Sequence, residues 1–266
     1  MIDLIEPITL ALIPGFLLLD FIIHQRSYKK PRHWRLRGAM VTAAIFFLTG
    51  EVAMFWGNLL GEMHLFDSSS LGLWGAIPGI LAYEFGHYWY HRAAHKWNWL
   101  WRAGHQMHHS AESLDAFGAF YLHPFDAAMF TTISSLVLFP LLGLSIEAGV
   151  IAALFLTFNA MFQHANIRTP HWLGYLIQRP ESHNIHHARG VHRHNYSDLP
   201  LWDMLFGTFR NPREIENVEC GFYKGASSRI PEMLIGKNVS SSSVGESVKT
   251  TVALASLVKP DAGLTN

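Results

Sequence analysis

The chain has 266 residues, of which half are hydrophobic and only 15% are charged. This length allows one large or two small domains, and the low charge is unusual for a soluble protein. Lys plus Arg and Asp plus Glu number 20 each, so no overall field favours nucleic-acid binding. The single cysteine, Cys220, excludes an internal disulfide framework and a cysteine-rich zinc or iron–sulfur site. Histidine is abundant, with 17 residues.

The first apolar segment, residues 8–23, contains Thr9 and Asp20 and falls slightly short of the roughly 20 residues that cross a bilayer. We interpret it as a membrane anchor and not as a removed signal peptide, because no basic region precedes it. Residues 24–37 follow, with six Lys or Arg and no acid. Nucleic-acid binding is one interpretation of such a run, but between two apolar segments the positive-inside rule favours a cytoplasmic loop.

Four more apolar segments follow, at residues 38–61, 71–85, 127–144 and 146–162. We therefore predict an all-α fold, a polytopic membrane helical bundle of about four to five membrane segments. If the basic loop is cytoplasmic, counting the crossings places every histidine cluster on the cytoplasmic face. The sequence thus predicts an integral-membrane, multi-pass protein with a cytoplasmic, histidine-rich helical cap.

Two regions differ in composition. Residues 1–212 hold the apolar segments and the histidines, and we assign them to one integral-membrane domain. Residues 213–266 end in a stretch rich in Ser, Gly and Thr without sustained apolar periodicity, so we expect a polar, flexible tail. No glycine-rich phosphate loop occurs in the sequence.

Histidines recur at helical spacing in three places. The stretch EFGHYWYHRAAH holds His87 and His91, four residues apart, which share a face on a helix. The stretch HQMHHS and the stretch ESHNIHHARG each hold the pattern HxxHH. The eight residues are His87, His91, His105, His108, His109, His183, His186 and His187. Eight imidazoles exceed a four-coordinate zinc site and suit two divalent first-row metals, although ligand type alone does not choose between iron, zinc and copper.

The remaining histidines do not all belong to such a centre. A lone histidine on an apolar face is usually a hydrogen-bonded packing residue, which is how we interpret His24, His33, His64, His95 and His171. A metal-dependent membrane hydrolase and a non-catalytic metal carrier both remain open as functions. Redox activation of dioxygen beside a hydrophobic pocket is the third function, and the absence of an HExxH motif favours it over a zinc hydrolase of that type.

The order and spacing of the three boxes resemble the fatty acid hydroxylase/sterol desaturase superfamily of integral-membrane di-iron enzymes, and the closest motifs are those of C-5 sterol desaturase-like members. The stretches FYLHPFD, MFQHAN and NYSDLPLWDMLFGTFRNP resemble further elements of that superfamily. The resemblance covers residues 71–212. It implies that the box histidines bind metal together with His164, and that His123 is either a tenth ligand or a supporting group.

The resemblance also implies the activity: O2-dependent oxidation of an unactivated C–H bond in a sterol, carotenoid, acyl or related lipid. We favour hydroxylation over desaturation, although the same boxes serve both. The expected cofactors are two Fe ions, with Zn as a substitute in purified protein, and O2 as co-substrate. Electrons are expected from an external ferredoxin or cytochrome b5-like donor and its reductase, and no nucleic-acid partner is expected. Ala160 stands where the fatty-acyl 2-hydroxylases of the superfamily carry a further histidine, which argues against that branch.

Several residues are expected to support the metal ligands instead of binding metal. Glu84 precedes His87 by three residues and is a candidate acceptor for its second ring N–H, which would fix the ring. The other candidates for this supporting role are Asp126, His192, His194, Asn195, Tyr196 and Asp203. We expect no catalytic residue beyond the metal centre.

Overall fold

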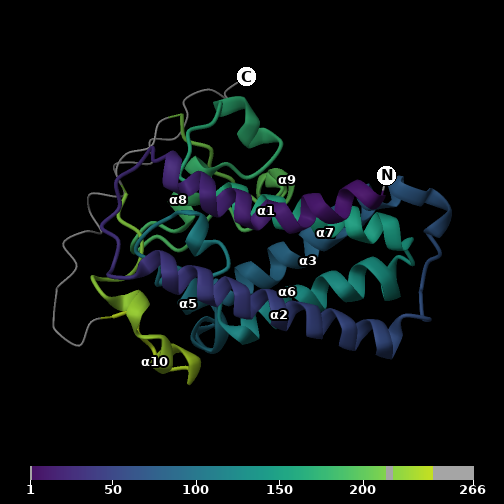
Figure 1. Cartoon of the computed structure of the whole chain (residues 1–266), viewed down its shortest axis with the longest axis horizontal. Helices are drawn as coiled ribbons and strands as arrows, with labels where there is room; N and C mark the ends of the chain where they lie inside the picture. The colour runs from purple at the N-terminus through teal and green to yellow at the C-terminus, as the bar shows by residue number, and fades with distance from the viewer. Residues whose placement is uncertain (1, 214–217, 242–266) are drawn as a thin grey trace.

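The computed structural model describes residues 2–213 and 218–241 (Figure 1). Within these ranges the chain is helical and contains no β-strand, which confirms the predicted all-α class. Long helices lie roughly along the longest axis of the molecule. They are α1 (Ile2–Ile22), α2 (Trp34–Leu60), α3 (Ala76–Lys96), α6 (Pro124–Leu136) and α7 (Ile146–His164).

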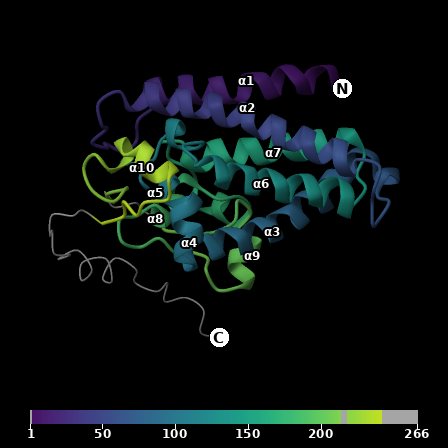
Figure 2. The ribbon, with the colours of Figure 1, turned by 90° about the horizontal axis from the view of Figure 1, so that it is seen from below.

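Short helical segments connect and cap the long ones. Helices α5, α8 and α10 gather at one end of the bundle in both views (Figures 1 and 2). The short α-helices are α4 (Asn98–Leu100), α5 (Gln106–His109), α8 (Pro180–His186), α9 (Pro200–Leu205) and α10 (Ile230–Leu234). The 3-10 segments are η1 (Ser69–Gly75), η3 (Ala116–Gly118), η5 (His171–Tyr175) and η6 (Ala226–Ser228), and the π-helical segments are η2 (Trp101–His105) and η4 (Val137–Leu141).

Three helices among the described residues are long and apolar enough to cross a membrane: Trp34–Leu60, Pro124–Leu141 and Ile146–His164. The apolar helical stretch Ala11–Ile22 of α1 is shorter. The expected segment 71–85 becomes η1 and the first half of α3, and α3 does not qualify because charged and histidine residues interrupt its apolar character. Of the four to five membrane segments that we expected, three therefore meet the criteria of length and composition.

The outward faces of these helices remain apolar. On α2, Phe46, Phe47 and Phe55 are exposed to 57%, 71% and 57%, and so many large exposed apolar side chains on one helix are unusual for a soluble protein. Inside the bundle, α2 packs against α6, while α1 and α3 both pack against α7. Small residues permit close approach, as Ala148 and Ala152 of α7 are fully buried. The helices are thus apolar both on the faces that pack inside the bundle and on the faces that point outward, as expected for a protein in lipid.

Residues 218–241 pack onto the histidine-bearing end of the bundle. Phe222, Met233 and Val239 are buried in one core cluster with Trp34 of α2 and Met107 of α5. We expected a flexible tail from residue 213 onward; this part of it is instead anchored by burial of apolar side chains. Residues 214–217 and 242–266 lie outside the described residues, so for them the tail stays a prediction.

Candidate metal centre

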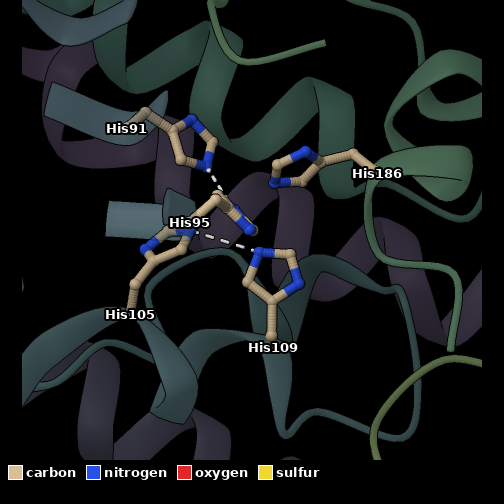
Figure 3. Close-up of side chains that lie close together, drawn as sticks. All are labelled: His91, His95, His105, His109 and His186. Atoms are coloured by element: carbon tan, nitrogen blue, oxygen red, sulfur yellow. Dashed lines mark hydrogen bonds between the residues drawn. The ribbon is translucent and has the colours of Figure 1, made fainter. Parts of the chain in front are cut away.

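Five histidines converge where α3, α5 and α8 meet. One ring nitrogen from each histidine lies within 4.8 Å of those of the other four (Figure 3). We call them group A: His91, His95, His105, His109 and His186. His91 and His95 lie one turn apart on α3, and His105 and His109 are likewise four residues apart, across the junction of the π-helical segment η2 with α5. Each pair shares a helix face for this reason.

Four further histidines form a second cluster, in which one ring nitrogen from each likewise lies within 4.8 Å of the others. We call them group B: His108, His164, His183 and His187. His108 and His109 enter different groups, as do His186 and His187, because neighbouring residues on a helix point about 100° apart. The groups are adjacent, since the rings of His109 and His187 stack with centroids 4.3 Å apart. Each HxxHH box therefore contributes to both groups.

The spacing of the ring nitrogens matches a metal's coordination shell. Within group B, the Nε2 atom of His183 lies 3.1 Å from that of His164 and 3.0 Å from that of His187. Within group A, the Nε2 atoms of His105 and His109 are 3.1 Å apart. A metal bound at about 2.1 Å from each imidazole places neighbouring donors about 3.0 to 3.4 Å apart, for right-angle and tetrahedral geometries respectively. Both groups therefore fit one first-row metal ion each.

Two group A rings are held in orientation by hydrogen bonds from their Nδ1 atoms. The Nδ1–H of His91 donates to the carbonyl oxygen of Tyr196 over 2.6 Å. The Nδ1–H of His105 donates to Asp126 over 2.8 Å, and that carboxylate also accepts from the Tyr90 hydroxyl. These bonds select the tautomer that leaves Nε2 unprotonated and aimed at the group, as metal-ligating histidines require.

Backbone carbonyls fix two more rings. His164 donates through Nδ1 to the carbonyl of Ala160 over 2.7 Å, and His186 donates to the carbonyl of His194 over 2.8 Å. Ala160, which replaces the additional histidine of the 2-hydroxylases, therefore still serves the site through its backbone. The contact of His194 with His186 is made by its backbone carbonyl and not by its ring.

Several ring nitrogens are buried without a hydrogen-bond partner. They include His186 Nε2, which belongs to the ring that His194 fixes, and the Nδ1 atoms of His95, His108, His183 and His187. A buried polar atom without a partner costs free energy, so such a concentration indicates a ligand. A metal ion in group A would satisfy the Nε2 of His186.

Burial also keeps these rings neutral. Desolvation, followed by the neighbouring histidines, lowers the pKa of His109, His186 and His187 well below the ordinary range of histidine. Burial lowers the pKa of His192 to about 4 as well. A neutral imidazole is the form that binds metal, so the site is prepared for metal without first losing protons.

Eight of the nine predicted histidines fall into the two groups, and one does not. His87 lies instead with Glu84 and Asp198 in a third set of potential ligand atoms within 4.8 Å of one another. His95, which we interpreted as a packing residue, occupies group A in its place. The other histidines interpreted in that way lie outside the groups; His24 contacts Arg35 and His171 hydrogen-bonds the carbonyl of Asn211.

Two further expectations differ from the geometry. His123 precedes α6 and caps it, because its Nδ1 accepts from the backbone N–H of Phe125. It lies outside all three sets of potential ligands. The carboxylate of Glu84 is 3.9 Å from Nδ1 of His87, too far for a hydrogen bond, since it is turned toward the backbone amides of Asp198 and Leu199.

The loop after α8 carries the remaining predicted supports. Asp203 accepts from the amides of Tyr196 and Ser197 and from the hydroxyl of Thr208. Asn195 has a left-handed backbone with φ of 52°, and its side chain bridges to the backbone of residues 182 and 210. The ring of His192 approaches His109 to 3.3 Å, Nδ1 to Nδ1. These contacts hold the loop that supplies the carbonyls to His91 and His186.

A cavity of about 450 Å³ leads from the helical bundle to the histidines. Most of its wall is apolar and comes from α2, α6 and α7, with Ile45, Phe130 and Leu156 among the lining residues. Histidines of both groups line it, including His91 and His164. This shape suits a long hydrophobic molecule whose reacting carbon lies beside the metals.

Comparison with known proteins identifies relatives with lipid-oxidising names. The family model described as fatty acid hydroxylase matches residues 76–208. An alkylglycerol monooxygenase from Homo sapiens is 31% identical over 181 residues, which cover 64% of this chain and 38% of that protein. A sphinganine C4-monooxygenase from Arabidopsis thaliana is 25% identical, covering 58% of this chain and 60% of the relative.

A bacterial relative extends the same pattern. An ornithine lipid hydroxylase from Rhizobium tropici is 30% identical over 150 residues, covering 54% of this chain and 44% of that protein. The chain spans only 34% to 46% of the length of the three alkylglycerol monooxygenases that it matches. No solved structure matches the chain significantly.

Proposed function

Because this chain belongs to the fatty acid hydroxylase family, we propose that it is an O2-dependent di-iron membrane enzyme that hydroxylates an unactivated C–H bond of a lipid. The observation that carries the proposal is the position of groups A and B at the inner end of an apolar cavity. The relatives named for alkylglycerol, sphinganine and ornithine lipid support a lipid substrate and a monooxygenase reaction.

Group A would hold one iron ion and group B the other, through the Nε2 atoms that their outward hydrogen bonds leave free. Two bound iron ions would supply the reductive activation of O2 that oxidation of an unactivated C–H bond requires. The chain itself contributes neutral ligands of fixed tautomer. Asp126 and the carbonyls of Tyr196, Ala160 and His194 keep the rings in place.

The cavity contributes orientation and exclusion of water. Its apolar walls on α2, α6 and α7 would bind the hydrocarbon part of a lipid and hold a carbon beside the histidines that also line the cavity. Phe130 lines the cavity next to the histidines, with its ring centroid 4.8 Å from that of His87 and 5.0 Å from that of Tyr90. Bulk water is kept from the reacting carbon by this lining.

We further propose that electrons come from an external ferredoxin or cytochrome b5-like donor. Lys96 and Arg102 are exposed near the histidine groups and supply positive charge for an acidic partner. We propose that this end of the molecule is cytoplasmic, and the basic loop at residues 24–37 supports this orientation by the positive-inside rule.

The test compares wild-type protein expressed in iron-rich medium with His186→Ala and with His64→Ala, which alters an exposed histidine far from both groups. We expect about two irons per wild-type chain and an O2-dependent lipid product that has gained one oxygen atom. His186→Ala should lose metal and product, and His64→Ala should retain both. Metal content is measured by mass spectrometry of the protein, O2 consumption by an electrode, and the product by lipid mass spectrometry.

Other outcomes contradict the proposal in distinct ways. Loss of two hydrogens from the lipid, without gain of oxygen, would identify a desaturase. Tightly bound metal with turnover in anaerobic buffer would identify a hydrolase, and bound metal without any lipid product would favour a carrier.

A further inference from the structure

A third buried cluster adjoins the two histidine groups and supplies no potential ligand atom to either of them. It consists of Glu84 and His87 on α3 and Asp198 in the loop before α9; we call it the acceptor cluster. The three residues are 0%, 8% and 5% exposed. Two carboxylates and one imidazole are thus buried together in the middle of an apolar bundle, where an uncompensated set of acceptors is costly.

The internal hydrogen bonds leave this cluster incomplete. Glu84 Oε2 accepts the amides of Asp198 and Leu199 over 2.9 and 3.3 Å, but Glu84 Oε1 is buried without a partner. His87 Nδ1 is also buried without a partner. In the part of the chain that the structure describes, the Asp198 carboxylate receives one hydrogen bond, from the side-chain amide of Gln163 over 2.7 Å. The cluster therefore has free acceptor positions.

Two members of the cluster, His87 and Asp198, face the lipid cavity beside the proposed metals, and Glu84 lies behind them. His87, Asp198 and Gln163 all line the cavity, whose other walls are largely apolar. The His87 ring stacks on that of His91, a member of group A, with centroids 5.5 Å apart. When a polar group of a bound lipid contacts the acceptor cluster, the lipid carbon that lies beside the metals is therefore only a few covalent bonds from that polar group.

The geometry favours a hydrogen-bond donor over a third metal ion. Neighbouring Nε2 atoms in groups A and B are 3.0 to 3.3 Å apart, whereas Nδ1 of His87 is 3.9 Å from the nearest Glu84 oxygen. That Glu84 oxygen is already occupied by two amides. The members that a ligand in the cavity can reach are therefore His87 and Asp198, and a hydroxyl or ammonium group can donate to either of them.

We propose that the acceptor cluster binds a free hydroxyl or ammonium group of the lipid substrate and so selects lipids with such a donor near the carbon that is oxidised. The inference rests on the proposed function, which it deepens by naming the substrate class. Hydrocarbons and lipids whose polar groups are fully capped leave the buried acceptors unpaired and are rejected, as in other sites built to bind a hydroxyl group.

The experiment measures equilibrium binding of three lipids with the same hexadecyl chain to the metal-loaded protein in detergent. One is a glycerol monoether with free hydroxyls, one is the same ether with both hydroxyls methylated, and one is hexadecylamine. We expect at least one donor lipid to bind roughly tenfold more tightly than the methylated ether. Whichever donor lipid is preferred identifies the donor as hydroxyl or ammonium.

Two variants tie this preference to the cluster. Asp198→Asn replaces an acceptor oxygen with a donor, and His87→Phe removes both ring nitrogens while keeping a flat ring against His91. Each should reduce the preference to about threefold or less without lowering metal content. The matched control is Asp67→Asn, which changes an exposed carboxylate in the loop before η1 and should leave the preference unchanged.

The results separate this inference from the function on which it rests. Equal binding of free and methylated lipids, or an unchanged preference in both variants, would overturn the inference even if the wild-type protein hydroxylates lipids. Loss of a metal ion in His87→Phe and Asp198→Asn would also overturn it and would identify a third metal site. A selective wild-type protein that never incorporates oxygen would instead contradict the proposed function.

Discussion

Three histidines follow one face of α3, and the last two of them reach group A. Consecutive members are four residues apart, which corresponds to about 6 Å along the helix. From His87 to His95 the distance along the axis is therefore about 12 Å, far more than one coordination shell spans. His91 and His95 face α5 and α8, whereas His87 lies one turn closer to the apolar bundle, beside Phe130.

Replacing His95 and His87 separately should have unequal effects on metal content. We expect His95→Ala to lower the metal content from about two ions per chain to about one, because group A loses a ligand. His87→Ala should retain about two, since His87 belongs to neither group of potential ligands and its contact with group A is the stacking of its ring on that of His91. Elemental analysis of the purified proteins, beside His64→Ala, measures the difference. Metal loss in His87→Ala with retention in His95→Ala would reverse the assignment.

The sequence alone does not decide whether His87 or His95 joins His91 in holding a metal ion. EFGHYWYHRAAH holds two overlapping HxxxH pairs, 87/91 and 91/95, and both place two rings on one helical face. Only the tertiary approach of α5 and α8 decides which pair shares a metal. The two HxxHH boxes were predicted from their spacing and from the resemblance to the superfamily, whereas His164 was predicted from the resemblance alone.

Helices α5 and α8 are too short to persist without their neighbours, and both carry buried histidines. Burial lowers the pKa of His108 and His109 on α5, and of His186 on α8, well below the ordinary range. For a histidine whose pKa is lowered in the folded state, the unfolded chain binds more protons once the pH falls below the ordinary pKa of about 6.5. Acid therefore favours unfolding when no metal is bound.

We expect the metal-free protein to lose thermal stability steadily as the pH falls from about 6.5 toward 5, with little change between about 7 and 8. Thermal unfolding in detergent after chelation measures this dependence. Metal-loaded protein is the first control, because bound metal opposes protonation until it is released. A His186→Gln variant should show a shallower dependence, since one titrating ring is removed. A melting temperature that does not change between pH 7 and pH 5 would contradict the pKa shifts.

At the level of elements, sequence patterns predicted the long helices better than their supports. Apolar runs marked α2, α6 and α7, but nothing in the residue types of Ala160 or Tyr196 indicates that their carbonyls fix His164 and His91. The packing of residues 218–241 was missed for a related reason. Phe222, Met233 and Val239 are spaced too irregularly to display helical periodicity, although all three are buried.

At the scale of the whole molecule, the basic loop and the histidine groups lie at the same end of the bundle. The side chain of Arg26 bonds to Asn166, two residues beyond His164 of group B. The opposite end is formed by the connection after α2, where the amide of Leu65 donates to the carbonyl of Pro140. Part of the loop's charge is used internally, since Lys30 pairs with Asp20 and Asp115. The exposed remainder is available to orient the protein in a membrane.

This arrangement predicts which end of the bundle faces the cytoplasm. In a Cys220→Ser background, single cysteines are introduced by Ser27→Cys in the basic loop and Ser70→Cys in η1, both at exposed positions. A membrane-impermeant maleimide added to intact cells should label Ser70→Cys at once and Ser27→Cys only after permeabilisation, because the loop with the excess of Lys and Arg stays inside. The Cys220→Ser parent controls for background labelling. Labelling of Ser27→Cys in intact cells would place the histidine groups outside, where a cytoplasmic electron donor cannot reach them, and would require a different source of electrons.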